Sequence, residues 1–267
     1  MKSTETIGPS DVNAVYEGPG GDLFELFMGQ QIHIGGLQSS TELAERAGIK
    51  AGLHGVDLCC CNGAGMRFLV RFHDVASMVG VDASPTVVER GRRRCEEEGL
   101  AARIEFVLGD ACDTGLPAGQ ADFVWGEDAW CYVPDKGKLI AEACRIVRPG
   151  GMIGFTDWVE GRAGLDSAEA ERFMSFMRFG SIQDVEGYRR LLGRSGCDVL
   201  EAEDTGRFPA YMDLYINMLE MQLKYDALRI LGFEPRLLES VLGELSFLAQ
   251  LAHADKIAQG RFIARRK

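Results

Sequence analysis

Short apolar runs that end in polar or acidic residues alternate along the chain with stretches whose apolar residues recur at helical spacing. The runs with the length and composition of strands lie near 56–61, 75–82, 103–110, 121–127, 152–158, 198–204 and 260–266. Alternation of strands and helices is typical of a mostly parallel sheet with helices on both faces. The pattern therefore predicts an α/β, Rossmann-like fold built on a seven-stranded sheet.

Two further helical regions lie outside this alternation. Residues 1–10 show no periodic pattern, and we expect them to lack regular structure, whereas apolar residues between 15 and 28 predict a broken amphipathic helix. The stretch ahead of the last strand is also helical by periodicity. We therefore expect residues 1–44 to form a lid segment and residues 45–267 to form one domain with a helical insertion at about 206–259.

Capping residues and periodicity place the remaining helices. Ser39 or Ser40, together with Glu42, would cap a helix at 41–47 that Gly48 ends. The other helices expected around the sheet lie at 66–72, 85–98, 136–147, 168–178 and 183–194.

The first expected strand leads into a glycine-containing turn. Asp57 lies in the strand, Gly63 and Gly65 follow it, and the next residues are compatible with a helix. Glycine tolerates positive φ and has no Cβ, so the backbone can approach a ligand closely, and the helix directs free N–H groups at that ligand. Asp82 ends the second strand, where a carboxylate can accept hydrogen bonds from both hydroxyls of a ribose.

Cysteines fill the positions between the first strand and these glycines. A residue other than glycine is strained at φ above zero, so we expect Cys59 and Cys61 to lie still at the strand end. The turn proper would then begin at Asn62 and Gly63, because asparagine is the next best residue there. The dinucleotide fingerprint G-x-G-x-x-G is absent, which disfavours a nicotinamide oxidoreductase.

The whole turn, D-x-C-x-C-x-G-x-G, resembles the D-x-G-x-G-x-G first motif of class I S-adenosylmethionine-dependent methyltransferases, with two glycines replaced by cysteine. The third strand ends in Gly109-Asp110-Ala111, which resembles the adenine-binding turn of that superfamily, and R-P-G-G at 148–151 is another of its recurrent features. The resemblance implies S-adenosylmethionine as cofactor. The contacts it implies are Asp57, Cys59, Cys61, Asn62, Gly63, Gly65, Asp82, Ala83, Asp110, Ala111 and Glu127.

The amino-terminal segment resembles the lid of the sarcosine/dimethylglycine N-methyltransferase group. Tyr16 precedes an aromatic-rich helix, and the tetrapeptide I-H-I-G follows at 32–35. In that group the tyrosine and the lid close over the methionine part of the cofactor, so the resemblance points to Tyr16, Phe27 and His33. Gln30-Gln31 stand where the pattern of the group has Glu-Asp.

The loop after the fourth strand resembles the methyltransferase loop that faces both cofactor and substrate. The resemblance implies in-line transfer of a methyl group to a small molecule, with an amine favoured because aromatic rings attract a positive charge. The catalytic candidates are His33, Glu127, Asp128 and Tyr132. Trp130, Asp157 and Trp158 are expected to contact the substrate, whereas Trp125 lies within the strand and is expected to pack in the core.

Charge and composition restrict the classes of partner that we expect. The net charge of −11 argues against a nucleic-acid partner, whose phosphates would be repelled. No apolar run approaches the length of a membrane span, and the amino terminus has no apolar signal core, so we expect a cytoplasmic protein without a membrane partner. The eight cysteines form no C-x-x-C pair and have no histidine cluster nearby, so we expect packing thiols and no metal.

Several alternatives stay open. The chain could be a non-catalytic nucleotide-binding regulatory subunit, or it could methylate carbon, oxygen or sulfur in another small metabolite. Cys60, Cys61 or Cys131 would suit a thiophilic substrate, although the triple cysteine run does not match the separated cysteines of arsenic methyltransferases. The Met and Tyr stripe of the insertion, which includes Tyr215, is explained by core packing, by a substrate pocket or by a homodimer contact.

Overall fold

The structure is a computed structural model that describes residues 2–3 and 9–267, with side chains from residue 11 onward. Lys2–Ser3 form the short strand β1, and helix α1 begins at Pro9. The expectation that residues 1–10 lack regular structure is therefore wrong at these positions. Residues 1 and 4–8, on which the rest of that expectation falls, lie outside the described residues.

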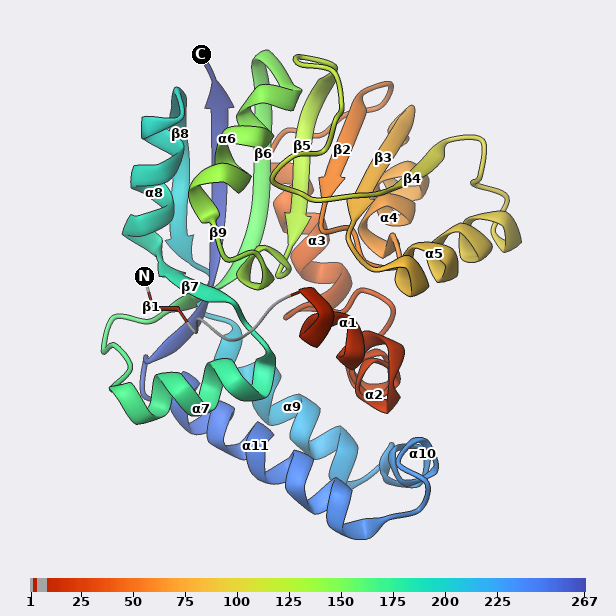
Figure 1. Ribbon diagram of the computed structural model, residues 1–267, viewed down its shortest axis with the longest axis vertical. Helices are drawn as coiled ribbons and strands as arrows, with labels where there is room; N and C mark the ends of the chain where they lie inside the picture. The colour runs from red at the N-terminus through yellow and green to blue at the C-terminus, as the bar shows by residue number, and fades with distance from the viewer. Residues whose placement is uncertain (1, 4–8) are drawn as a thin grey trace.

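A central sheet is the framework of the fold (Figure 1). Its seven main strands run in the order β8 (Cys197–Asp204), β9 (Ile257–Arg266), β6 (Val147–Glu160), β5 (Ala121–Glu127), β2 (His54–Leu58), β3 (Ser77–Asp82) and β4 (Ile104–Leu108). All neighbours pair in parallel except β9, which is antiparallel to both β6 and β8. The predicted Rossmann-like α/β fold with seven strands is confirmed.

Two short strands extend this sheet beyond the prediction. β7 (Ser181–Asp184) pairs with the last two residues of β6, and β1 pairs with β7. Sequence periodicity assigns Gln183 and Asp184 to a helix, but that helix, α8, spans Val185–Arg194. The Asp184 carboxylate accepts a hydrogen bond from the Gly187 N–H, so this residue caps α8 from the end of a strand.

Helices cover both faces of the sheet. α3 (Gly36–Arg46), α4 (Ala64–Phe72) and α5 (Pro85–Glu97) share one apolar cluster with Trp125 of β5, which is fully buried as predicted. On the opposite face, α6 (Lys136–Ile146) and α8 pack on Phe155 and Phe262, whose rings stack 4.6 Å apart. Because both faces are covered, the central strands are almost continuously apolar.

One predicted helix start needs correction. α3 begins at Gly36, five residues before the predicted start, so Ser39 and Ser40 are buried within the helix and do not cap it. Ser84 does occupy the N-cap position of α5, followed by Pro85, but its side chain makes no capping hydrogen bond. The Asp82 carboxylate accepts the Ser84 N–H instead.

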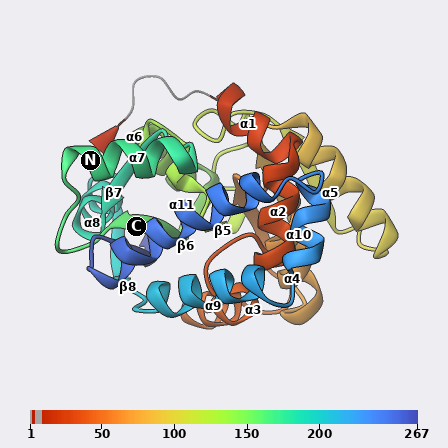
Figure 2. The ribbon, with the colours of Figure 1, turned by 90° about the horizontal axis from the view of Figure 1, so that it is seen from below.

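A separate helical layer lies across the carboxyl ends of the strands (Figures 1 and 2). It consists of α1 (Pro9–Glu17), α2 (Pro19–Met28), α7 (Ser167–Met177), α9 (Phe208–Glu220), α10 (Lys224–Ile230) and α11 (Pro235–His253). α9 to α11 lie between β8 and β9 in the chain. The helical layer has its own apolar core, which Trp158 at the end of β6 joins to the sheet.

Ion pairs fasten this helical layer to the sheet domain. Glu25 of α2 contacts Arg94 of α5 and lies 3.6 Å from Arg90 on the same helix. The Arg67 guanidinium of α4 donates to the Gln30 side chain at 2.7 Å. The lid thus has polar anchors on two helices of the domain that it covers.

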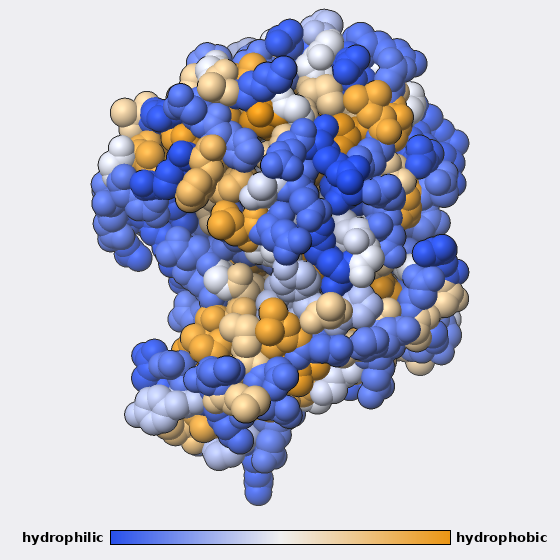
Figure 3. Space-filling view, turned by 180° about the vertical axis from the view of Figure 1, so that it is seen from behind, coloured by the Kyte–Doolittle hydropathy of each residue, from blue (hydrophilic) through white to orange (hydrophobic). Residues whose placement is uncertain are grey.

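Apolar side chains also reach the outer surface of the helical layer, as the orange atoms in the lower part of Figure 3 show. The most exposed of them on this layer are Met221, Tyr225, Phe233 and Leu237. Within the described residues, no helix combines the length and apolar character that crossing a bilayer requires.

Candidate functional site

Two adjoining cavities, an outer and an inner one, lie where the parallel strands end. The outer cavity is lined by Asp82 and Ala83 after β3 and by Asp110 and Ala111 after β4. The inner cavity is lined by residues of β2, α4, β5 and the lid, namely Asp57, Asn62, Gly65, Glu127 and His33. Tyr16, Cys59, Cys61 and Ala129 line both cavities. The structure thus brings the acidic residues of four strand ends around one cleft, where open α/β sheets bind ligands.

The cysteine turn between the two cavities differs from the prediction. Cys59 and Cys61 both have positive φ, 61° and 48°, so they belong to the turn and not to the strand, which ends at Leu58. The Cys59 N–H donates to the Val81 carbonyl at 2.8 Å, and the Cys61 N–H donates to Asp82 Oδ2 at 2.8 Å. These bonds to the end of β3 hold two cysteines in a backbone conformation that glycine adopts without strain.

Gly63 and Asn62 complete the turn and start α4. Gly63 has a φ of 75°, and a Cβ on it would lie only 2.5 Å from the Phe106 ring, so no other residue fits without a shift. Asn62 Oδ1 accepts the Ala64 N–H, while its amide nitrogen donates to the Gln30 carbonyl of the lid. Asn62 therefore links the turn at residues 59–63 to the lid.

Two carboxylates face each other across Gly65. A Cβ on this glycine would lie 2.6 Å from Glu127 Oε2 and 3.5 Å from Asp57 Oδ2. Burial raises the pKa of Asp57 well above its ordinary value, and the charges of Glu127 and Asp82 raise it further. This end of the inner cavity therefore favours a positively charged group, which would relieve the repulsion between the two acids.

His33 and Ser40 attach the lid to this acidic end. The Ser40 hydroxyl donates to Glu127 Oε1 at 2.6 Å, and His33 Nε2 lies 3.1 Å from the Ser40 oxygen and 3.3 Å from Glu127 Oε1. His33 is 3% exposed and still lines the inner cavity. The sequence gives no signal for Ser40, because its role depends on where α3 docks.

Asp82 and Asp110 are held in different ways in the outer cavity. Asp82 Oδ1 accepts the Ser84 N–H at 2.9 Å and Oδ2 accepts the Cys61 N–H, which opposes the rise that burial causes in its pKa. Asp110 Oδ1 accepts the Cys112 N–H at 2.8 Å, and the Asp110 side chain is exposed. Both carboxylates retain lone pairs for donors on a ligand.

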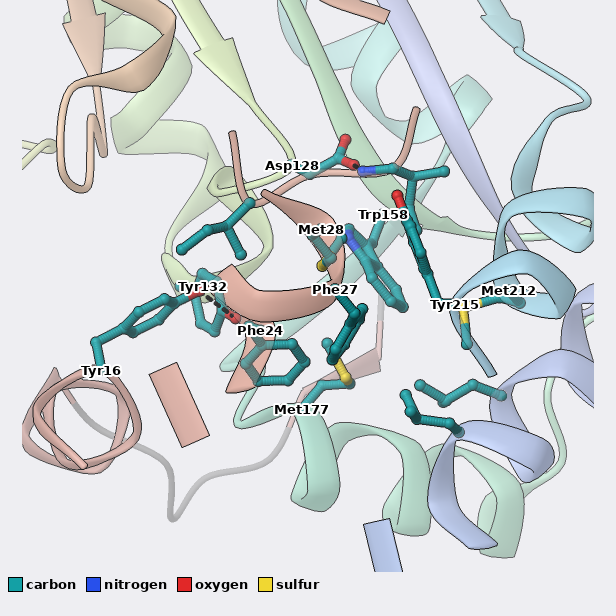
Figure 4. A pocket seen from close by; sticks show the side chains of 14 residues that line it. Tyr16, Phe24, Phe27, Met28, Asp128, Tyr132, Trp158, Met177, Met212 and Tyr215 are labelled. Atoms are coloured by element: carbon teal, nitrogen blue, oxygen red, sulfur yellow. Dashed lines mark hydrogen bonds between the residues drawn. The ribbon is translucent and has the colours of Figure 1, made fainter. Parts of the chain in front are cut away.

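A third, narrow cavity lies between these two cavities and the helical layer, and we call it the apolar cavity (Figure 4). Phe27 and Trp158 line it, as do Met177 of α7 and Met212 and Tyr215 of α9. Tyr16 borders all three cavities, whereas Tyr132 borders the outer and apolar cavities and Asp128 borders the inner and apolar cavities. A reacting atom that passes from one ligand to another would cross this junction.

Both oxygens of Asp128, at the junction, accept hydrogen bonds. Asp128 has a φ of 51°; Oδ2 accepts the Ile34 N–H and the Gln259 side-chain amide, each at 2.8 Å, and Oδ1 accepts the same amide at 3.0 Å. Gln259 also donates to the Ile34 carbonyl at 2.9 Å. Burial raises the pKa of Asp128, although these donors favour the charged form. The geometry therefore gives Asp128 a part in fixing the lid loop at the sheet.

Three expectations are corrected by the position of the side chains. Trp130 is fully buried, stacks on Phe155 at 4.0 Å and donates from its indole nitrogen to the Leu58 carbonyl, so it does not face the substrate space. Asp157 is also fully buried and accepts the Cys131 N–H and the Tyr188 hydroxyl, and burial raises its pKa to about 6. Phe27 borders the apolar cavity and neither the outer nor the inner cavity.

Lys136 fixes the loop that carries Tyr132, a role that the sequence does not predict. It is 1% exposed, and its ammonium donates to the Ser181 hydroxyl at 2.8 Å, to the Val133 carbonyl and, at 3.3 Å, to the Cys131 carbonyl. These bonds flank Tyr132 on both sides and fix the loop that carries it. No feature of the local sequence distinguishes this lysine from an exposed residue in the first turn of a helix.

The cysteines and acids form no metal centre in the part of the chain that the structure describes. No group of three histidine, cysteine, aspartate or glutamate side chains there is arranged to hold an ion. All eight cysteines are free thiols, and burial raises the pKa of Cys61 to about 12. Cys61 is therefore protonated near neutral pH and suits packing.

The sheet order, the strand-end acids and the covering lid together define the class I methyltransferase architecture. Residues 56–155 match the family described as "Methyltransferase domain". The methyltransferase GfsG of Streptomyces halstedii is 30% identical over 172 residues, which cover 63% of this chain and 61% of that protein. The chain thus spans about three fifths of the length of this curated relative.

Solved structures share the fold at lower identity. Phosphoethanolamine N-methyltransferase 2 of Haemonchus contortus, in complex with phosphomonomethylethanolamine and S-adenosylhomocysteine, superimposes with a TM-score of 0.87 at 22% identity, covering 98% of this chain and 61% of that one. A Galdieria sulphuraria protein assigned as a sarcosine dimethylglycine methyltransferase gives 0.77 at 22%, covering 86% and 85%. Residues 56–155 thus match a methyltransferase domain, and the fold agrees with the methyltransferase resemblance seen in the sequence.

Proposed function

We propose that this protein transfers a methyl group from S-adenosylmethionine to a small molecule. The observation that supports this most directly is the continuity of the site. One cleft, formed by the outer and inner cavities, passes the ends of β2, β3, β4 and β5, and Tyr16 borders both this cleft and the apolar cavity. A cofactor in the cleft and an acceptor in the apolar cavity would therefore meet at Tyr16, Tyr132 and Asp128.

The chemistry of the lining side chains fits the three parts of the cofactor. Asp110 would accept from the adenine amine beside the Ala111 backbone, and Asp82 would accept from the ribose hydroxyls. The Asp57 and Glu127 pair, which meets no lysine or arginine among the described residues that line the inner cavity, would attract the ammonium of the methionine part. The cofactor supplies a methyl group on a sulfonium that is already a good leaving group.

The protein's own contribution would be alignment and exclusion of water. Burial raises the pKa of both Tyr16 and Tyr132, so the two phenols stay protonated at neutral pH and their oxygens remain neutral hydrogen-bond acceptors. An N–H of the acceptor that donates to a phenol oxygen would turn the nitrogen lone pair toward the methyl group, and the lid would keep solvent out. Positioning of this kind can lower a barrier by several kcal/mol.

An amine is the acceptor that this site favours. A neutral amine attacks through its own lone pair and loses a proton only afterwards, whereas an aliphatic alcohol needs a base before or during attack. The phenols stay protonated at neutral pH because their pKa values are raised, so they cannot accept a proton there, and the Asp128 carboxylate is engaged by the Ile34 N–H and the Gln259 amide. Aromatic rings around the apolar cavity would also attract an ammonium product. The structural neighbour from Haemonchus contortus is itself named an N-methyltransferase.

Calorimetric titration tests the cofactor assignment. We expect S-adenosylmethionine and S-adenosylhomocysteine to bind the wild-type protein, and Asp82→Asn to weaken binding by about 10- to 100-fold, the equivalent of one strong hydrogen bond to a charged group. Asp122→Asn is the matched control, because Asp122 lies at the opposite end of β5 and bonds His54 and Arg148. An absence of heat at millimolar ligand, or a preference for NADH, would contradict the proposal.

Turnover separates the enzyme from a regulatory nucleotide-binding subunit. The measurement is transfer of a radiolabelled methyl group to a panel of matched amines, phenols and thiols. The amines are expected to be labelled fastest. Binding of the cofactor without transfer to any compound of the panel would favour the regulatory alternative.

A further inference from the structure

The apolar cavity offers no positive charge to a ligand. None of the described residues that line it is lysine, arginine or histidine, and its single charged residue is Asp128. The aromatic lining comprises Tyr16, Phe24, Phe27, Tyr132, Trp158 and Tyr215. Figure 4 shows these rings arriving from the lid, the sheet and α9 to surround the space. An anionic group inside it would be surrounded by apolar atoms and one carboxylate.

The donors at this cavity are all neutral groups, and several of them already have partners. The Ile34 N–H donates to Asp128, and the Tyr16 and Tyr132 hydroxyls are 3.0 Å apart and bond each other. The Tyr215 hydroxyl lies 3.5 Å from the His33 carbonyl. His33 itself faces the inner cavity, where Ser40 and Glu127 surround it. A phosphate, carboxylate or sulfonate would lose its hydration in this space without gaining a cation, which costs several kcal/mol.

We propose that the acceptor is a hydrophobic molecule that carries no anionic group, held by aromatic and methionine side chains and presenting its nucleophile to the Tyr16 and Tyr132 pair. This inference rests on the proposed function, because it assigns the apolar cavity to the acceptor. It distinguishes this chain from the Haemonchus contortus neighbour, whose structure holds phosphomonomethylethanolamine, a phosphate-bearing ligand. Likeness of fold therefore does not carry over to the acceptor class.

A matched pair of fluorescent probes tests the charge preference. N-phenyl-1-naphthylamine and 1-anilinonaphthalene-8-sulfonate share one ring system, and only the second carries a sulfonate. Both are titrated into wild-type protein saturated with S-adenosylhomocysteine. We expect the uncharged probe to bind at least about tenfold more tightly, since the sulfonate meets no cation in the cavity. Equal binding, or tighter binding of the sulfonate, would overturn the inference.

Variants locate the probe in the apolar cavity. Met212→Lys and Met28→Lys each place an ammonium at the cavity wall, and Met28 is only half-buried, so its variant folds even if Met212→Lys does not. Either change is expected to shift the ratio of the two affinities by about tenfold toward the sulfonate. Leu214→Lys is the control, because Leu214 is 47% exposed on α9 and does not line the cavity. The inference would also be overturned if both variants kept their fold by circular dichroism and neither changed the ratio of the two probe affinities.

Cofactor binding is measured apart from the probes, so the two proposals fail in different ways. A missing calorimetric signal for S-adenosylhomocysteine contradicts the proposed function. A normal calorimetric signal for S-adenosylhomocysteine, together with equal binding of the two probes, contradicts only the proposed acceptor class. Methyl transfer to phosphoethanolamine would overturn the acceptor class while confirming the proposed function.

Discussion

The hydroxyl oxygens of Tyr16 in the lid and Tyr132 after β5 lie 3.0 Å apart, and the two rings meet edge to face with centroids 6.0 Å apart. This contact closes the lid over the junction of the three cavities. Because burial raises the pKa of both phenols, neither is ionised near neutral pH, and the bond joins two neutral groups. The pair can therefore orient a nucleophile and hold the lid in one interaction.

Removing either hydroxyl should slow methyl transfer. Tyr16→Phe and Tyr132→Phe are each expected to lower kcat/KM about five- to tenfold, the equivalent of one neutral hydrogen bond. The double variant should lose little more than either single one, because both changes delete the same bond. Tyr211→Phe, which removes a hydroxyl bonded to Gln38 on the outer side of α9, should leave kcat/KM unchanged. Fully additive losses would show that the two hydroxyls act independently.

The acidic pair at Gly65 should make the cofactor-free protein less stable as the pH rises. Burial, Glu127 and Asp82 raise the pKa of Asp57, so the folded state binds its proton more tightly than the unfolded state does. The free energy of unfolding then falls as the pH increases from the ordinary value of about 4 through the raised pKa. Asp57→Asn should remove this slope and stabilise the cofactor-free protein at pH 7 by at least about 1 kcal/mol, while weakening cofactor binding.

Urea unfolding at several pH values measures this effect. Asp122→Asn should change the pH dependence of the free energy of unfolding in the opposite direction. Burial tends to raise the pKa of Asp122, but the His54 N–H and Arg148 outweigh it and lower the pKa. Stability from Asp122 is present above its ordinary pKa and is lost as the pH falls. A destabilised Asp57→Asn protein at pH 7 would contradict the assignment of repulsion at Gly65.

The cysteine turn should gain stability when glycine replaces its two left-handed residues. Cys59→Gly and Cys61→Gly are each expected to raise the free energy of unfolding by about 0.5–1 kcal/mol, because the strain relieved exceeds the entropy that glycine adds to the unfolded chain. Cys60→Gly should instead destabilise the protein, since Cys60 is not among the residues with positive φ and its side chain is buried. Thermal unfolding of the three variants checks the order, and destabilisation by all three would refute the strain argument.

The sequence predicts the sheet well because its signal is local. The strands that end at Asp57-Leu58, Asp82 and Leu108 each form one apolar run, and parallel strands necessarily bring their carboxyl ends to one edge. The positions of the Asp57, Asp82 and Asp110 side chains around one cleft follow from that rule. The φ of Cys59 and Cys61 does not follow, because bonds from β3 impose it and the local preference of cysteine is overridden.

The acceptor side of the site could not be predicted from local pattern. Phe27 and Tyr215 lie 188 positions apart in the chain, and their rings meet at 5.3 Å only because α2 and α9 dock on each other. The sequence does not predict where the Trp130 ring points, for a related reason. It follows the end of β5, where the alternation of side chains no longer holds, and a short 3₁₀ turn directs its ring back into the core.

The ion pair between Glu25 of α2 and Arg94 of α5 should contribute to closing the lid. Both side chains are 18% exposed, so solvent screens their interaction less than it screens a surface pair. Glu25→Gln is expected to weaken cofactor binding about fivefold at low salt, the equivalent of about 1 kcal/mol, because the lid carries Tyr16 and His33 to the cleft. Arg94→Gln should have a similar effect, and the double variant should show a coupling of the same size.

Arg93→Gln on the same helix is the control, since Arg93 is 64% exposed and pairs with Glu97. Calorimetry at 20 mM and 500 mM salt measures all four proteins against wild type, and equal affinities at low salt would show that this pair does not hold the lid.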